Sequence, residues 1–317
     1  MKVSIGANIK EGPWGGGNLF VINLRNYLEK KGHEVIFDLN SNDIDLILLT
    51  DPRRKSESSA FTHKQIKKYK RNNNHVKVVH RINECDERKD TKGVNKFYIN
   101  ANKVADHTIF VSKWLSDIYK KSGFLSESSI IYSGSDLKVF NRDGFNNFNG
   151  IQKVKLVTHH WSSNWNKGFD TYKRIDELIN DEYWSNKIEF TYIGNVPKNL
   201  ELKNTNIIEP LSGIPLAAEL KNHNIYVTGS LNEPSGNHHI EAAQCGLPLL
   251  YINSGALPEY CSGFGVEFNL KNFEDKLKYL IDNYSTYFQE LTKYPFNAEK
   301  MCEEYLDIFM ELHQNKK

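Results

Sequence analysis

Residues 225–248 have the sequence IYVTGSLNEPSGNHHIEAAQCGLP, in which a strand, a loop and the start of a helix follow one another. The apolar run Ile225 to Thr228 predicts a short buried strand, and the pattern from Ile240 to Gly246 predicts a helix. The loop between them therefore leads into a helix N-terminus, where backbone amides can bind an anion.

Two carboxylates frame this loop. Glu233 follows the strand at its carboxyl end, and we expect Glu241 about two turns into the helix, on the same general side. Gly236 allows the backbone to approach a ligand, and the amides near Asn237 and His238 are expected to open toward an anion. One carboxylate can act at a reacting centre while the other holds a polar group; a general acid–base pair is the alternative.

The same alternation continues along the chain, and it predicts an α/β protein with parallel sheets covered on both faces. Apolar runs predict strands at 3–7, 33–39, 45–50, 76–80, 107–111, 153–158, 188–193, 206–209, 225–228, 247–252 and 265–268. Helical patterns occupy 18–31, 62–71, 113–121, 171–180 and 215–222. The Gly- and Asn-rich segment 141–150 predicts a linker between two Rossmann-like, doubly wound halves.

The length of 317 residues exceeds that of one typical domain, about 100–150 residues. We expect an N-terminal Rossmann-like domain at 1–142, a C-terminal one at 143–296, and a helix within 297–317 that packs back towards the N-terminal domain. Ligands of open α/β sheets bind outside the carboxyl ends of the strands. Two such domains facing each other would therefore form a binding cleft.

Composition excludes several classes of protein. The net charge of +2 is too small to indicate a nucleic-acid partner. No apolar run reaches the roughly 18–20 residues that cross a bilayer. The cysteines lack C-x-x-C spacing, which argues against a disulfide framework or a zinc site and favours a reducing, cytoplasmic setting. They are Cys85, Cys245, Cys261 and Cys302.

Basic residues are concentrated between Arg53 and Lys77. This segment contains many Lys and Arg side chains and a single acid, Glu57. A solvated helix face would explain it, and so would attachment of a peripheral protein to an anionic membrane surface. Both interpretations stay open at the level of the sequence.

A glycine-rich loop, Gly12 to Asn18, follows the first predicted strand and opens the first helix, which is where phosphate groups are received. The spacing G-x-G-x-x-G that begins at Gly15 would need glycine where Phe20 stands, so a nicotinamide dinucleotide site is only weakly indicated. Asp38 occupies the place of a ribose-binding acid in that alternative. A simple tight turn is the remaining interpretation.

Two further loops carry candidate residues. Lys167 precedes Gly168 at a helix entrance, and its ammonium group can pair with a diphosphate on the same sheet edge as Glu233. His80 ends the strand predicted at 76–80. It is either an ordinary polar core residue or a general base or hydrogen-bond donor that faces the cleft.

With these residues together, the chain resembles the retaining nucleotide-sugar glycosyltransferases of family 4. The resemblance rests on the glycine loop, on the pair Glu233 and Glu241 followed by AAQCGLP, and on segments 105–115, 130–140 and 255–259. It implies the GT-B fold of two facing Rossmann-like domains. It also implies transfer of a sugar from a nucleotide-diphosphate donor to a glycan or lipid-linked acceptor, with retention of anomeric configuration.

The resemblance implies roles for individual residues. Glu233 would lie close to the transferred sugar and Glu241 would bind the ribose hydroxyls. Lys167 and the backbone of Gly236, Asn237 and His238 would bind the diphosphate. From the other domain, Gly16 and Gly17 would complete the cradle and His80 would reach the donor sugar or the acceptor.

The chain also departs from the family pattern. Ser162 stands where an arginine is common, five residues before Lys167. Ser162 itself, Arg81 and Asn83 are therefore candidate contacts to the diphosphate or the acceptor. The resemblance implies no metal and no cofactor besides the nucleotide sugar, and a cytoplasmic enzyme, peripheral at the inner membrane face. A nucleotide-sugar epimerase of the same architecture and a non-catalytic nucleotide-sugar binding protein are the alternatives.

Overall fold

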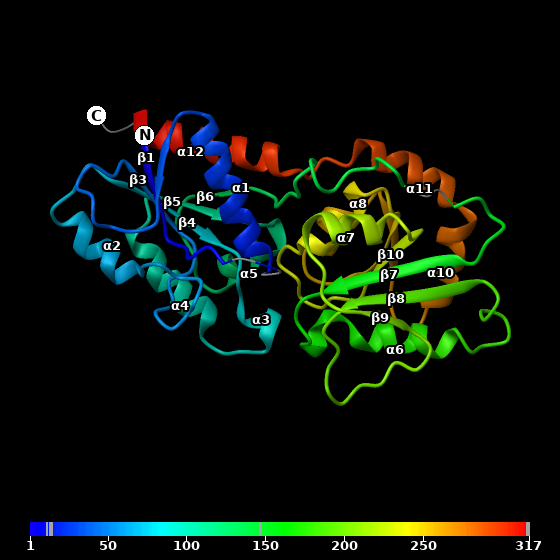
Figure 1. Cartoon of the computed structure of the whole chain (residues 1–317). Coiled ribbons are helices and arrows are strands. Elements are labelled where there is room, and N and C mark those ends of the chain that lie inside the picture. The colour runs from blue at the N-terminus through cyan, green and yellow to red at the C-terminus, as the bar shows by residue number, and fades with distance from the viewer. Residues whose placement is uncertain (11, 13–14, 146–147, 315–317) are drawn as a thin grey trace. The chain divides into compact units, whose positions relative to one another are not determined.

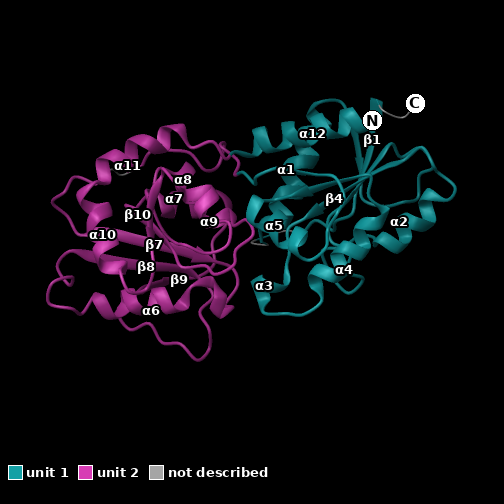
Figure 2. Ribbon diagram, turned by 180° about the vertical axis from the view of Figure 1, so that it is seen from behind, with its two compact units in different colours: residues 1–134, 297–317 teal, residues 135–296 magenta. Residues whose placement is uncertain are grey.

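The computed structural model describes residues 1–10, 12, 15–145 and 148–314, and the chain divides into two compact units (Figures 1 and 2). Unit 1 comprises residues 1–134 and 297–317, and unit 2 comprises residues 135–296. The boundary between the units lies between residues 134 and 135, earlier in the chain than the expected boundary between residues 142 and 143. Residues 146–147 of the expected linker, residues 13–14 of the glycine-rich loop and residue 11 just before it lie outside the described residues.

Unit 1 is built on a six-stranded parallel sheet with the order β2-β1-β3-β4-β5-β6, which confirms the predicted α/β class. Its order reverses between β1 and β3, so the loops after these strands diverge and leave a crevice at the carboxyl edge. The strands are β1 (Lys2–Ile5), β2 (Glu34–Ile36), β3 (Leu46–Leu49), β4 (Lys77–Ile82), β5 (His107–Phe110) and β6 (Ser128–Ile130).

Helices cover the unit 1 sheet. One apolar cluster joins α1 and α12 to the sheet through residues such as Leu24 and Phe309, a second forms under α2, and a third lies under α4 and α5. The helices are α1 (Gly16–Lys30), α2 (His63–Lys70), α3 (Asp86–Lys89), α4 (Val94–Ala101), α5 (Lys113–Lys121) and α12 (Ala298–Gln314).

Helix α12 belongs to unit 1 although unit 2 precedes it in the chain (Figure 2). Its buried side chains include Met301, Tyr305 and Phe309, which lie in the same cluster as the α1 residues Phe20 and Leu24. Unit 1 is therefore completed only by the last segment of the chain.

Unit 2 repeats the architecture with a second six-stranded parallel sheet of order β12-β11-β10-β7-β8-β9. Its order reverses between β7 and β10, which places a crevice beyond the ends of these two strands. The strands are β7 (Val154–His160), β8 (Ile188–Gly194), β9 (Asn206–Ile208), β10 (Ile225–Thr228), β11 (Leu249–Ile252) and β12 (Gly265–Phe268).

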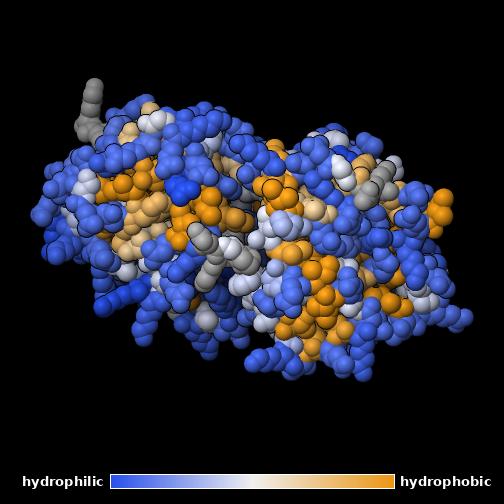
Figure 3. Space-filling view, viewed as in Figure 1, coloured by the Kyte–Doolittle hydropathy of each residue, from blue (hydrophilic) through white to orange (hydrophobic). Residues whose placement is uncertain are grey.

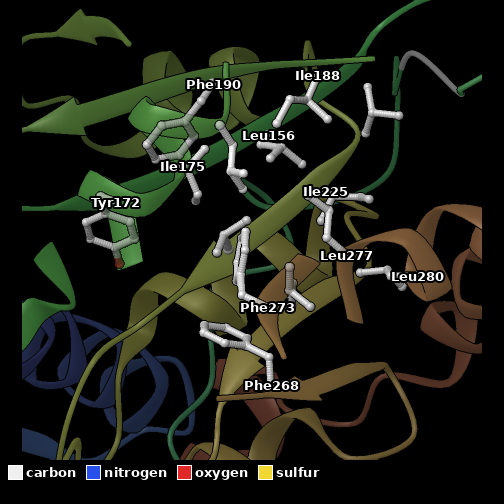
Figure 4. Close-up of a cluster of buried hydrophobic side chains, with 14 of the residues drawn as sticks. Leu156, Tyr172, Ile175, Ile188, Phe190, Ile225, Phe268, Phe273, Leu277 and Leu280 are labelled. Carbon is white, nitrogen blue, oxygen red and sulfur yellow. The ribbon is translucent and has the colours of Figure 1, made fainter. Parts of the chain in front are cut away.

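In one apolar cluster of unit 2, Leu156 and Phe190 from the sheet pack with Phe273 and Leu277 of α10 (Figure 4). Hydrophilic residues cover most of the face shown in Figure 3. The unit 2 helices are α6 (Phe169–Leu178), α7 (Gly213–Leu220), α8 (Asn237–Gln244), α9 (Leu257–Cys261), α10 (Phe273–Asp282) and α11 (Tyr284–Glu290).

Two expectations need correction. Helix α8 begins at Asn237 instead of Ile240, so Glu241 lies just over one turn into the helix and not two. Strand β4 continues beyond His80 to Ile82, so His80 does not end it. Within the part of the chain that the structure describes, no helix is both long and apolar enough to span a bilayer.

Candidate functional site

The loops at the unit 2 crevice bring Lys167 and Glu233 together. Lys167 follows β7 and Glu233 follows β10, and the Lys167 Nζ lies 2.5 Å from the Glu233 Oε2. The Glu233 carboxylate is 4% exposed, so much of its hydration is replaced by this pairing. Charges held out of water are stabilised only when well paired, so the ion pair fixes both side chains at the end of the sheet.

Close backbone contacts at glycines hold Glu233 in place. A Cβ atom on Gly255, whose φ is +63°, would lie 2.4 Å from the Glu233 amide nitrogen. One on Gly236 would lie 2.4 Å from His238 Cε1 and 3.2 Å from Glu233 Cγ. Larger residues at either position would displace the backbone or the side chain of Glu233.

Helix α8 points its N-terminus into the same loop region. Its N-cap is Gly236, no described side chain caps it, and its first turn contains no acidic residue. The amides of Asn237 and His238 therefore carry the positive end of the helix dipole beside Lys167. An anionic group could bind these amides and the lysine together.

Glu241 projects from α8 toward β7, where its Oε2 lies 2.9 Å from His159 Nε2. Both residues are buried. His159 was not predicted as a site residue, although it directly follows the strand predicted at 153–158, on the same sheet edge as Lys167. A carboxylate has two oxygens, so Glu241 can accept from His159 and also from a ligand hydroxyl.

Three more buried histidines surround this region. His160 Nε2 lies 2.6 Å from the Tyr172 hydroxyl, and His238 Nε2 lies 3.0 Å from Thr228 Oγ1. Burial lowers the pKa of His160 and of His238 well below its usual value, and it lowers the pKa of His239 to about 3. These three rings are neutral at pH 7 and add no positive charge to the site.

Ser162 is partly exposed in the loop after β7, and its Oγ accepts a hydrogen bond from the Asn164 amide at 3.2 Å. It supplies a hydroxyl where the resembled family has a guanidinium. The charge on this loop therefore comes from Lys167.

Unit 1 has its own cavity, of about 260 Å³, at the crevice between β1 and β3. It is lined by the loops after β1, β3 and β4 and contains four predicted residues, Gly16, Gly17, Arg81 and Asn83. Five charged residues that were not predicted as site residues line the same wall. These are Lys10, Asp51, Arg53, Glu84 and Arg88.

The two acids of this wall are paired with cations. Asp51 accepts from Arg53 Nε and from Nη2, each at 2.8 Å, and Glu84 Oε2 lies 2.9 Å from Lys89 Nζ. Burial alone would raise the pKa of Asp51, but the hydrogen bonds from Arg53 hold it below its usual value. The negative charges of both carboxylates are therefore balanced by cationic side chains of the protein.

His80 lies in the core of the sheet and does not line the cavity. It is fully buried, its Nδ1 lies 2.8 Å from Asn102 Oδ1, and burial lowers its pKa to about 4. Neighbouring residues of a strand point to opposite faces, so His80 points away from Arg81. Its contact with a substrate stays a prediction.

Among the described residues, no three His, Cys, Asp or Glu side chains are grouped so that they could hold a metal ion. A scan of protein-family models gives no match, and no curated protein matches the sequence significantly.

Solved structures do match over nearly the whole chain. A glycosyltransferase from Rickettsia africae aligns with a TM-score of 0.70 at 13% identity, covering 99% of this chain and 98% of its own. Sucrose-phosphate synthase from Thermosynechococcus elongatus aligns with a TM-score of 0.66 at 13% identity, covering 99% of both chains. Anabaena HepE, in complex with UDP and glucose, aligns with a TM-score of 0.67 at 13% identity, covering 98% of this chain and 99% of its own. With its two six-stranded parallel sheets, this chain shares the α/β fold of these proteins, the GT-B fold.

Proposed function

We propose that the protein is a glycosyltransferase that moves a sugar from a nucleotide-diphosphate donor to a glycan or lipid-linked acceptor with retention of anomeric configuration. The fold shared with glycosyltransferases supports the reaction class. The observation that carries the proposal is the ion pair of Lys167 and Glu233 beside the N-terminus of α8. This arrangement offers a cation, backbone amides and a carboxylate at one sheet edge.

In the proposed reaction the bond between the sugar C1 and the diphosphate breaks, and a bond from C1 to the acceptor oxygen forms on the same face. The acceptor proton passes to an oxygen of the departing diphosphate. Lys167 and the α8 amides stabilise the negative charge that develops on that leaving group. The chain's own groups supply this stabilisation, and the proposal includes no metal or cofactor.

The two glutamates have different roles in this scheme. Glu233, beside Lys167, orients the sugar, and Glu241, oriented by His159, accepts hydrogen bonds from the ribose hydroxyls. Orientation of the donor accounts for much of the rate when no protein group transfers a proton.

A panel of nucleotide sugars, screened by thermal shift and then by release of nucleoside diphosphate with a set of acceptors, tests the proposal. We expect one donor to raise the Tm, and we expect Lys167→Ala and Glu233→Ala to abolish transfer. Lys293→Ala is the matched control, since Lys293 pairs with Glu290 at 3.0 Å on the surface of the same unit.

Several outcomes would reject the proposal. Unimpaired transfer by Glu233→Ala would remove its assigned role. Conversion of a donor without any acceptor would instead identify an epimerase, and donor binding without release of nucleoside diphosphate would identify a binding protein.

We also propose that this enzyme acts in the cytoplasm, at the inner membrane face. Helix α2 supports this, because Ile66 and Tyr69 are buried while Lys64, Lys67 and Lys68 are exposed. A cavity of about 360 Å³ that Lys64 and Lys67 line adds Lys70 and Lys103 to the basic surface. Since the apolar face of α2 is used in the core, attachment to anionic lipid would be electrostatic.

A further inference from the structure

We propose that unit 2 has a second ligand site, a cavity at the amino edge of its sheet that binds a neutral, hydroxyl-rich sugar. The site stands on the geometry of unit 2. Only the statement that this sugar belongs to a glycan on which the enzyme acts rests on the proposed function.

The cavity has a volume of about 610 Å³ and lies where β7 and its neighbours begin, at the end opposite the β7 arrowhead in Figure 1. Pockets for small ligands typically enclose about 300–1,000 Å³, so this volume suffices for one. Lys167 and Glu233 lie beyond the other ends of the strands. The seven-residue strand β7 is about 20 Å long, so the cavity is separate from the candidate donor site.

His223 is a buried polar residue in the wall of this cavity. It is 5% exposed, and its Nδ1 lies 2.9 Å from the backbone oxygen of Glu219. Burial lowers the pKa of His223, so the ring is neutral at pH 7, and the carbonyl places its one N–H proton on Nδ1. Nε2 is then an acceptor without a hydrogen-bond partner among the described residues. A buried acceptor of this kind favours a ligand that donates a hydrogen bond.

The charges around the cavity disfavour an anion. Lys155 Nζ lies 3.6 Å from Glu189 Oε1, so these two lining residues balance each other. Glu219 also lines the cavity and pairs with no lysine or arginine among the residues that the structure describes. It belongs to the last turn of α7, where the helix dipole is negative. The cavity therefore repels phosphate groups and attracts hydroxyl donors.

Side-chain amides supply much of the remaining polar surface, from Asn149, Gln152, Asn206 and Asn222. Each amide contains both hydrogen-bond donors and an acceptor, and a sugar hydroxyl likewise donates and accepts. Phe145 adds an apolar surface on which the C–H groups of a sugar ring can pack. A mostly apolar ligand would leave the amides unpaired, so the lining favours a sugar.

Saturation-transfer NMR of the full chain tests the site with the neutral disaccharides maltose, cellobiose, lactose and N,N′-diacetylchitobiose, in the presence of saturating UDP. We expect at least one of them to bind. In a titration, Glu219→Ala should weaken its binding at least about tenfold, as for loss of a charged hydrogen bond. Glu201→Ala is the matched control, because Glu201 pairs with Lys203 at 3.7 Å on the surface of the same unit, outside this cavity. Binding by none of the disaccharides, or equal affinities of Glu219→Ala and its parent, would overturn the proposal.

His223→Phe is the second variant, because it removes the Nε2 acceptor and keeps an aromatic ring. Gln152→Ala accompanies it, since Gln152 is exposed and its replacement should leave the Tm unchanged. We expect both variants to weaken disaccharide binding. Unchanged binding in both would remove the site even if His223→Phe alone were misfolded.

Inorganic phosphate distinguishes a neutral ligand from an anion at the same place. We expect Lys155→Gln to leave the affinity for phosphate unchanged. Phosphate binding that Lys155→Gln weakens and Glu219→Ala strengthens would reject the neutral sugar as the ligand of this cavity.

A transfer assay separates this site from the proposed function. We expect Glu219→Ala to transfer sugar to a small soluble acceptor at the rate of the parent, because Glu219 lies at the opposite edge of the sheet from Glu233. If no nucleotide sugar is bound or used but disaccharide binding that depends on Glu219 remains, the proposed function fails and the site stands. Transfer without such disaccharide binding would retain the function and remove the site.

Discussion

Lys167 has two competing partners in the proposed reaction. In the structure its ammonium pairs with Glu233 at 2.5 Å, and the donor diphosphate would need the same group. Glu233 therefore opposes diphosphate binding electrostatically while it serves the sugar. We predict that Glu233→Gln binds nucleoside diphosphate several-fold more tightly than the parent and yet transfers sugar far more slowly. Calorimetry with the nucleoside diphosphate and a transfer assay give the two values.

Lys167→Met should show the opposite behaviour in the same binding experiment, with at least about tenfold weaker affinity for the diphosphate because a charge-assisted hydrogen bond is lost. Lys293→Met again serves as the control. If Glu233→Gln weakened diphosphate binding as much as Lys167→Met, the competition between carboxylate and phosphate would be excluded.

For single residues, the sequence predicts which ones lie on the same sheet edge. It does not predict which side chains contact each other there. Lys167 and Glu233 follow different strands of one parallel sheet, so their meeting could be inferred from the order of elements. The sequence does not reveal that His159 is the partner of Glu241, because this contact depends on how α8 packs on β7. For His80 and Arg81, strand alternation places one in the core and one in the cavity, but the sequence alone does not reveal which.

Helix α2 is the element on which membrane attachment depends. Its three exposed lysines, Lys64, Lys67 and Lys68, each add about 1 kcal/mol near an anionic surface. We predict that changing all three to Gln weakens binding to phosphatidylserine vesicles about 100-fold at low salt. Sedimentation with vesicles over a range of salt concentrations measures this. Lys70 is left intact because it pairs with Asp106 at 3.0 Å.

A second triple variant with the same change in net charge distinguishes the effect of the α2 lysines on vesicle binding from the effect of overall charge. Lys271, Lys276 and Lys278 lie on or beside α10 of unit 2, and their replacement by Gln removes the same charge. Equal losses in both triple variants would attribute vesicle binding to overall charge and remove α2 from the proposal.

Most regular elements could be predicted because β-branched and aliphatic runs identify strands of a parallel sheet. Some of the elements that were not predicted have little apolar pattern. Strand β6 is only three residues long and begins with two serines, and α3 is a single turn of charged residues. Short polar elements of this kind are held by tertiary contacts, which no local pattern reveals.

The buried histidines make stability of the whole molecule depend on pH. Burial lowers the pKa of His160 and His238 well below the usual value, that of His239 to about 3 and that of His80 to about 4. The unfolded chain titrates near pH 6.5 and therefore binds protons that the folded chain does not. The free energy of unfolding should fall by about 1.4 kcal/mol per histidine between pH 7.5 and 5.5.

Urea unfolding at the two pH values measures this loss. His239→Leu should reduce it, since neither ring nitrogen of His239 has a partner among the described residues and the variant cannot take up that proton. His75→Gln, at an exposed histidine, is the control. The same pH dependence in His239→Leu and the parent would contradict the assignment.

The core of unit 1 includes α12, a helix that follows unit 2 in the sequence. A substitution of a buried residue in α12 should therefore destabilise unit 1 selectively. Phe309 of α12 is fully buried in the same cluster as Phe20 and Leu24 of α1, so Phe309→Ala should destabilise unit 1 by about 3–5 kcal/mol. The unit 2 cluster that contains Leu156 and Phe273 has no member from α12 among the described residues, so it should keep its stability. Hydrogen exchange resolved by peptide mass spectrometry measures both effects, at β3 for unit 1 and at β7 for unit 2.

Phe273→Ala is the reciprocal variant, because Phe273 is buried in the core cluster of unit 2. It should accelerate exchange in β7 and leave β3 protected, the reverse of Phe309→Ala. Independent responses would mean that each sheet keeps its own core and unfolds as its own cooperative unit. Equal acceleration in both strands by either variant would instead show that the two units unfold together, and α12 would then stabilise the whole chain and not unit 1 alone.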